Sequence, residues 1–96
     1  MQRLLILLLL VALVASGGIK GGWKTISPDD PYVQEVASYA LSRLNNADKY
    51  IIDSVERQLV SGFNYRIHLN FTQFDYQRSL LVYEDIEGLK EIKSFC

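Results

Sequence analysis

Cysteine is almost absent from this sequence. Cys96, the last residue, is the only one, so the chain has no second cysteine with which to close an internal disulfide. Secreted domains of this size usually depend on several disulfides. The thiol of Cys96 is therefore free, or joins two chains, or pairs with a cysteine in a part of the protein beyond this sequence.

Groups of catalytic or metal-binding side chains are missing as well. His68 is the only histidine and lies inside an alternating, strand-like segment, whereas Cys96 is expected on an unanchored terminus. A Cys–His nucleophilic pair needs the two side chains in hydrogen-bond contact, and no set of histidine, cysteine and carboxylate residues has the spacing of metal ligands. We therefore expect no enzyme activity, no metal and no cofactor, and we interpret His68 as a solvated residue.

A long apolar segment is also lacking. The apolar run from Leu4 to Val14 has 11 residues, whereas a transmembrane helix needs roughly 18 to 20. Arg3 before the run and small residues after it are typical of a secretory signal peptide. We expect cleavage after Ser16, which leaves residues 17–96 as a secreted domain without stable membrane association. The alternative is that the signal stays attached as a membrane anchor.

No excess of positive charge is present either. The formal net charge is −1 and becomes −2 once Arg3 is removed with the signal peptide. Nucleic acids and anionic membranes attract basic surfaces. A nucleic-acid partner is therefore not expected.

Glycine and proline are concentrated directly after the signal peptide. Their frequency predicts that residues 17–27 form an extended, flexible arm. Trp23 follows the second glycine pair of this arm, and we expect its side chain to pack the root of the arm against the sheet.

A helix is predicted after the arm. Asp30 followed by Pro31 is typical of a helix start. Apolar residues then recur with the 3.6-residue period of an amphipathic helix of about four turns. The helix should end at Asn45 and Asn46, because asparagine tolerates the left-handed conformation of a helix end. The two tyrosines of this segment are interpreted as packing and surface cover.

The second half of the chain changes to a two-residue period. Apolar and polar residues alternate without exception from Phe63 to Phe71, which is typical of a half-buried antiparallel strand. Further strands are expected at residues 50–58, 80–84 and 89–95, with a tight turn at Gly88. One helix followed by strands predicts an α+β fold, in which the N-terminal helix packs against a curved antiparallel sheet of four to five strands.

The segment Gln58-Leu59-Val60-Ser61-Gly62 interrupts this pattern. One interpretation is a hairpin whose tip, from Leu59 to Gly62, exposes Leu59 and Val60 to water. The other is a continuous strand with a β-bulge at Ser61 and Gly62. Periodicity alone does not choose between the two.

Three features together resemble the cystatin family: Gln-x-Val-x-Gly at residues 58–62, a glycine-bearing arm before the helix PYVQEVASYALSRLN, and a strand beginning FNYRIHL directly after the motif. The resemblance implies a secreted, reversible, non-covalent inhibitor of papain-like cysteine proteases, such as cathepsin L-like enzymes, that blocks the active-site cleft. The implied protease-binding residues are Gly21 and Gly22 in the arm, Gln58, Leu59, Val60, Ser61 and Gly62 in the first hairpin, and Ile86 and Gly88 in the second.

The sequence departs from the family pattern at two of these segments. Most cystatins carry Pro-Trp at the tip of the second hairpin, where this chain has Asp85-Ile86-Glu87-Gly88 and thus no aromatic anchor. Lys20 also precedes the arm glycine, where an aliphatic residue is usual. An alternative function is therefore a binding protein that keeps the cystatin fold with weak or lost protease inhibition.

The sequence also predicts a glycosylation site and two forms of dimer. Asn70 begins an Asn-Phe-Thr sequon on the polar face of its strand, so it is a candidate glycosylation site. Opening of the first hairpin would give domain-swapped dimers that lack inhibition, and Cys96 would allow a disulfide-linked dimer.

Overall fold

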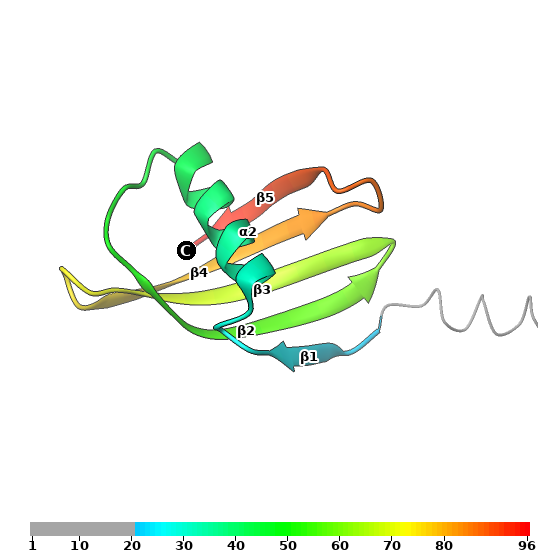
Figure 1. Ribbon diagram of the computed structural model, residues 1–96, viewed down its shortest axis with the longest axis horizontal. Helices are drawn as coiled ribbons and strands as arrows, with labels where there is room; N and C mark the ends of the chain where they lie inside the picture. Colours follow the sequence, from blue (N-terminus) through cyan, green and yellow to red (C-terminus); the bar gives the residue numbers. More distant parts are fainter. Residues whose placement is uncertain (1–20) are drawn as a thin grey trace, which may run out of the picture.

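The computed structural model describes residues 21–96. The predicted signal peptide and residues 17–20 of the arm lie outside the described residues. One helix crosses one face of a five-stranded antiparallel sheet whose strands follow sequence order (Figure 1). The elements are β1 (Trp23–Ile26), α2 (Pro31–Arg43), β2 (Ile51–Val60), β3 (Gly62–Phe71), β4 (Tyr76–Glu84) and β5 (Lys90–Phe95). The predicted α+β architecture is confirmed.

The ends of α2 are set by the residues that the sequence suggested. The Asp30 carboxylate accepts hydrogen bonds from the backbone N–H groups of Tyr32 at 2.8 Å and Val33 at 3.2 Å, and both groups would otherwise lack a partner. Asn45 has a φ of 55°, which ends the helix. Among residues 21–96, no helix has the length and apolar character needed to cross a bilayer.

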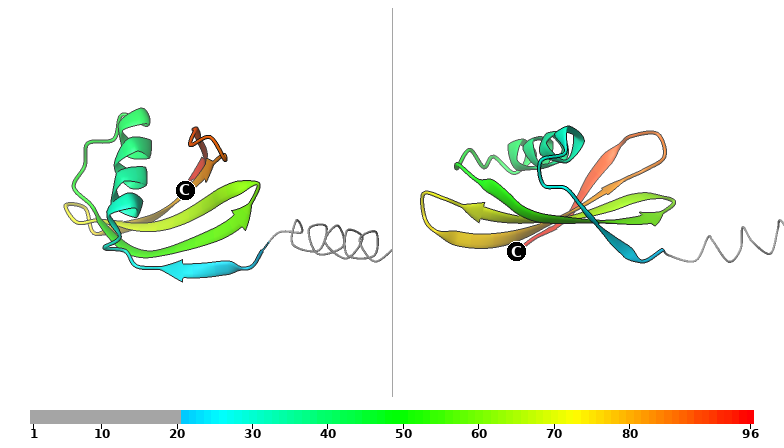
Figure 2. Two further views of the ribbon diagram at one scale, coloured as in Figure 1. Left: turned by 45° about the vertical axis from the view of Figure 1, so that its right-hand side comes forward. Right: turned by 60° about the horizontal axis from the view of Figure 1, so that its bottom comes forward.

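The core lies between α2 and the sheet. Figure 2 shows the helix against one face of the curved sheet, while the other face is uncovered. The helix buries an apolar stripe against alternate residues of the three central strands, as the periods of 3.6 and 2 require. The buried residues are Val33, Val36, Ala37, Ala40, Leu41, Ile52, Val55, Tyr65, Ile67, Leu69, Phe71, Leu80 and Val82.

Part of the predicted arm is a strand instead. Residues 23–26 form β1, which pairs antiparallel with β2 and aligns Trp23 with Gln58. The Arg66 guanidinium carbon lies 3.9 Å from the centroid of the Trp23 ring, a cation–π contact that fixes the start of β1. The expectation that Trp23 packs the arm root is confirmed. The flexible-arm prediction counted the flanking glycines and prolines and overlooked the short β-forming stretch between them.

The C-terminal end is also better ordered than expected. The N–H group of Cys96 donates to the Ser79 carbonyl at 2.9 Å, and the Ser79 N–H group donates to the Cys96 carbonyl at 3.0 Å. The terminus is therefore anchored to β4, while the Cys96 side chain is exposed. Strand β4 itself begins at Tyr76 rather than at residue 80, because its first residues pair with the end of β3 although their pattern is polar.

Candidate functional site

Three separate segments end at one edge of the molecule. In Figure 1 the turn between β2 and β3, the turn between β4 and β5, and the start of β1 all lie at the right-hand side. These are the three segments in which the sequence placed the candidate binding residues. The structure therefore brings Gly21, the residues 58–62 and the residues 85–89 to a common edge, which we call the wedge edge.

The first hairpin combines both interpretations of the Gln58–Gly62 segment. Leu59 and Val60 continue β2, as the bulge interpretation required, but the chain reverses at Ser61 so that Val60 pairs with Gly62. Leu59 is 59% exposed, whereas Val60 is only half-buried rather than fully exposed. Paired strands thus hold an apolar hairpin tip in a defined shape.

Gly62 lies where no other residue fits. Its φ is +112°, and a Cβ atom added there would come within 2.2 Å of the Glu84 carbonyl oxygen and 2.9 Å of the Asp85 Cα atom. Residues with a side chain rarely adopt this φ. The glycine of the motif therefore allows the backbone of the first hairpin to lie directly against the base of the second hairpin.

Gln58 connects the arm to the first hairpin. Its side-chain N–H group donates to the Gly21 carbonyl at 3.0 Å, and its side-chain oxygen accepts from the Asn64 amide at 3.1 Å. The Gly21 N–H group in turn donates to the Leu59 carbonyl at 3.2 Å. Gly21 is consequently held beside the hairpin through both of its backbone groups. Gly22, the alternative arm glycine, is exposed and has open space around it.

The second hairpin presents two aliphatic side chains on a well-formed turn. Ile86 is 84% exposed and Leu89 is 67% exposed. The Asp85 carboxylate accepts from the N–H groups of Glu87 and Leu89, each at 2.9 Å, and Gly88 has a φ of +91°. The turn is thus stabilised from within, and its apolar residues point into solvent.

A cavity of about 530 Å³ is lined by residues of both hairpins. Its lining includes Leu59, Phe63 and Ile86 as well as Tyr32 from the helix and Glu84 from β4. The Tyr32 hydroxyl donates a hydrogen bond to the Glu84 carboxylate. Burial raises the pKa of Tyr32, and this bond to Glu84 raises it further, so the hydroxyl keeps its proton in the physiological pH range.

Sequence reasoning missed several residues at this edge. Leu89 was interpreted as the start of a strand, and Tyr32 as a residue of helix packing and surface cover. Tyr83 was overlooked although its hydroxyl donates to the carbonyl of Ser61 at the first tip. Glu84 carried a usable signal, since it continues the inward-facing series of Leu80 and Val82 and a carboxylate at such a position needs a partner.

Two polar candidates lie away from the wedge edge. His68 is not simply solvated, because its ring nitrogens lie 3.0 Å from the Ser79 hydroxyl and 3.1 Å from the Glu56 carboxylate. Asn70 is half-buried near the end of β3, on the face of the sheet opposite the helix. Within residues 21–96, no three histidine, cysteine or acidic residues cluster as metal ligands would.

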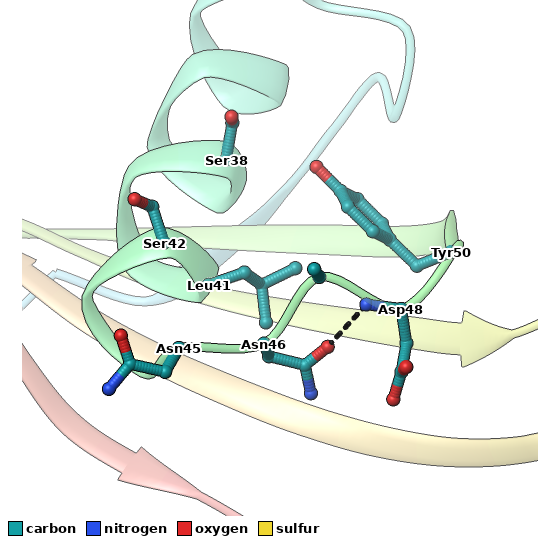
Figure 3. Close-up of a pocket in the computed structure, with 8 residues that line it drawn as sticks. Ser38, Leu41, Ser42, Asn45, Asn46, Asp48 and Tyr50 are labelled. Atoms are coloured by element: carbon teal, nitrogen blue, oxygen red, sulfur yellow. Dashed lines mark hydrogen bonds between the residues drawn. The ribbon is translucent and has the colours of Figure 1, made fainter.

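A second cavity, of about 480 Å³, lies at the C-terminal end of α2 (Figure 3). Its lining comes from the last turns of the helix and the segment before β2, and includes Leu41, Asn46 and Tyr50. The Asn46 side-chain oxygen accepts from the Asp48 N–H group at 3.0 Å and so helps to shape the loop. None of the predicted binding residues contributes to this cavity.

Comparison with known proteins identifies the family of this chain. The Cystatin domain family matches residues 21–96. Cysteine proteinase inhibitor 6 of Oryza sativa subsp. japonica is 36% identical over 69 residues, covering 65% of this chain and 61% of that protein. Mialostatin of Ixodes ricinus is 31% identical over 80 residues, covering 71% of this chain and 57% of that protein. The chain thus spans about three fifths of the length of these curated relatives. The helix-on-sheet fold, the wedge edge and the match over residues 21–96 together establish that the chain belongs to the cystatin family.

Proposed function

We propose that this chain is a reversible, non-covalent inhibitor of papain-like cysteine proteases and that its wedge edge enters the active-site cleft. The observation that carries this proposal is the convergence of the arm glycine and the two hairpin turns at one edge, with Leu59, Ile86 and Leu89 exposed on it. One similar protein bears the name of a cysteine proteinase inhibitor. Cathepsin L-like enzymes are the targets that we would test first.

Exposed aliphatic residues on stiff turns would supply the binding energy. Leu59, Ile86 and Leu89 are more than half exposed, so each gains about 1 to 2 kcal/mol when a partner covers it. Because the strands already order the turns, little conformational entropy is lost on docking. Asp85 adds to this order through its hydrogen bonds within the second turn.

The arrangement around Gly21 supports inhibition without cleavage. The Gly21 carbonyl accepts the Gln58 side chain, and its N–H group is bonded to Leu59. The bond from Gln58 has to break before the Gly21 carbonyl can turn toward a nucleophile, and the bond to Leu59 holds the preceding peptide group beside the hairpin. The arm would therefore lie along the cleft without reacting as a substrate.

Charge substitution at matched positions tests this proposal. Residues 17–96 are titrated against papain and a cathepsin L-like enzyme, as wild type, Leu59→Asp and Ile51→Asp. Leu59 and Ile51 both lie on β2 and are similarly exposed, at 59% and 52%, but Ile51 is at the opposite end of the strand. A charge at the tip should weaken inhibition by roughly 30-fold or more, as expected for a hot-spot residue. Equal inhibition by the two variants would refute the wedge.

The second hairpin favours one alternative function. Ile86 replaces an aromatic anchor and stands between the acidic residues Asp85 and Glu87. A binding protein that retains the cystatin fold without strong inhibition would have such a tip. Absence of inhibition by folded wild-type protein in the same titration would select this function.

We also propose that the protein is secreted. The apolar run after Arg3 followed by small residues supports a cleaved signal peptide. Intact-mass measurement of protein recovered from the medium should give a chain that begins at Gly17 or within a few residues of it. A secreted chain that retains residue 1, or a chain found only in membranes, would contradict cleavage.

Self-association is proposed in two forms. The tight turn at Ser61 is a hinge at which two chains would exchange strands, and such a dimer would lose the first tip. The exposed Cys96 thiol would permit a disulfide-linked dimer. Size-exclusion chromatography with and without reductant separates the two forms, and monomer alone after long incubation would contradict both.

A further inference from the structure

We propose that Tyr32, Glu84 and Lys90 form a clamp at the base of the second hairpin, that this clamp fixes the second hairpin relative to the first, and that it controls how slowly a bound protease dissociates. The part that concerns dissociation rests on the proposed inhibitory function. The three residues act as positioning residues, because they meet at the base of the second hairpin rather than on the exposed tips of the wedge edge.

Glu84 is buried although its side chain is acidic. It is 6% exposed and is the one buried charged residue among residues 21–96. A carboxylate removed from water is costly unless it is paired and hydrogen-bonded. Glu84 has both kinds of partner, since Tyr32 donates its hydroxyl and the Lys90 ammonium lies 3.4 Å from the same carboxylate oxygen.

Lys90 is held on several sides. Its side chain is only 19% exposed, and its ammonium lies 5.7 Å from the centroid of the Tyr32 ring and 5.3 Å from that of the Tyr39 ring. By contrast, the pair of Lys93 and Glu91 on the same strand is largely exposed. Exposed ion pairs of that kind contribute little to stability. The Glu84–Lys90 pair and the Glu91–Lys93 pair therefore differ in environment, although each joins a glutamate to a lysine.

The position of the clamp determines what it can control. Glu84 ends β4, Lys90 begins β5, and the two are register partners, so they close the base of the second hairpin. Tyr32 ties this base to the first turn of α2. On the other side, the Glu84 carbonyl packs against Gly62 of the first hairpin. A shift of Glu84 would therefore change the separation of the two hairpins.

A cluster held by a hydrogen bond and an ion pair has a different effect on the hairpin from a cluster of apolar residues. Well-packed apolar residues would stabilise the base of the hairpin equally well. Hydrogen bonds and an ion pair restrict the angle at which the hairpin leaves the sheet, because their geometry tolerates little rotation. Fixing that angle before docking lowers the ordering cost, and changes of this kind act mainly on the dissociation rate.

The test compares Tyr32→Phe with Tyr39→Phe. Both substitutions keep the ring beside Lys90 and remove only a hydroxyl, and within residues 21–96 only the Tyr32 hydroxyl has a hydrogen bond to Glu84. In the free protein, amide exchange at Asp85 and Gly88 should be about tenfold faster in Tyr32→Phe than in Tyr39→Phe, since a hydrogen bond to a charged group is lost. The dissociation rate from the protease should rise about tenfold, while the association rate changes less than about twofold.

Replacement of Glu84 provides a rescue experiment. Glu84→Gln can still accept the Tyr32 hydrogen bond, so it should retain slower dissociation and slower hairpin exchange than Glu84→Leu. If the three residues only stabilise the fold, amide exchange should instead rise throughout the sheet in proportion to the stability that is lost. That result, or unchanged dissociation in Tyr32→Phe, would overturn the clamp. If the wild type inhibits no protease, the inhibitory function fails, and the exchange data still decide whether the clamp fixes the hairpin.

Discussion

Replacing Gly62 with alanine probes the contact on which the wedge edge depends. The added Cβ atom would lie 2.2 Å from the Glu84 carbonyl oxygen and 2.9 Å from the Asp85 Cα atom. Both neighbours are backbone atoms, so neither can rotate away as a side chain would. The residue would also have to keep a φ of +112°. The two hairpins must therefore separate, or the first turn must refold.

The expected loss of stability has two parts. An unfavourable backbone conformation costs about 1 to 3 kcal/mol, and overpacking adds about 1 to 3 kcal/mol. We therefore expect the free energy of unfolding to fall by about 3 kcal/mol or more. For a domain of this size, a loss of about 3 kcal/mol corresponds to a decrease in melting temperature on the order of 10 to 25 °C.

Two other glycines make it possible to separate these parts. Gly88 has a φ of +91° but no atom within 4 Å of an added Cβ, and Gly22 has neither a positive φ nor a close neighbour. Gly88→Ala should therefore show only the backbone cost, of about 1 to 3 kcal/mol. Gly22→Ala should leave stability unchanged or slightly raised.

Urea and thermal unfolding of the three variants, followed by circular dichroism, give the ranking directly. The structure requires Gly62→Ala to be the least stable and Gly22→Ala the most stable. Equal losses for Gly62→Ala and Gly88→Ala would mean that the first hairpin does not pack against Glu84. In that case the two hairpins would not form the common wedge edge.

Gln58→Ala removes the side-chain bond to Gly21 and should lower the free energy of unfolding by about 1 kcal/mol, with faster amide exchange at Gly21; unchanged exchange there would contradict the contact. Burial raises the pKa of three tyrosines: Tyr32, Tyr50 and Tyr65. The folded state holds these protons more tightly than the unfolded state does. The protonated tyrosines therefore contribute stability that is fully present below the ordinary pKa of 10.0 and is lost as the pH rises through the higher pKa values of the folded state. An absorbance titration in which every tyrosine ionises together would refute this. In a eukaryotic secretory host, wild-type protein should carry a glycan that Asn70→Gln lacks, and identical masses would count against modification.

The sequence predicted those elements in which local pattern and burial agree. β3 alternates strictly because one of its faces lies on the core, and α2 is delimited by Asp30 and Asn45 through the same hydrogen-bond chemistry that the prediction used. The first half of β4 was missed because its residues are polar and exposed, so only pairing with β3 makes them a strand. β1 was missed because four residues between glycines and prolines carry no visible period.

The candidate site was predictable to a different extent. A motif within five consecutive residues located the first hairpin, since its glycine and its apolar residues are adjacent in sequence. The clamp joins Tyr32 with Glu84 and Lys90. Tyr32 lies 52 residues before Glu84 in the chain. Such a cluster exists only once α2 has docked on the sheet. Of the three, only Glu84 gives a hint in the sequence, as a charge in an inward-facing position.

The order of the strands has a topological consequence. In an antiparallel sheet whose strands follow sequence order, successive turns alternate between the two ends, so the β2–β3 and β4–β5 turns share one end whatever their sequences are. The β3–β4 turn, at residues 72–75, necessarily falls at the opposite end. The order of the strands therefore places the wedge edge and the β3–β4 turn at opposite ends of the sheet. A second domain or a surface tether inserted at residues 72–75 would point away from the wedge edge, and the length of such an insertion would have no influence on the contacts made there.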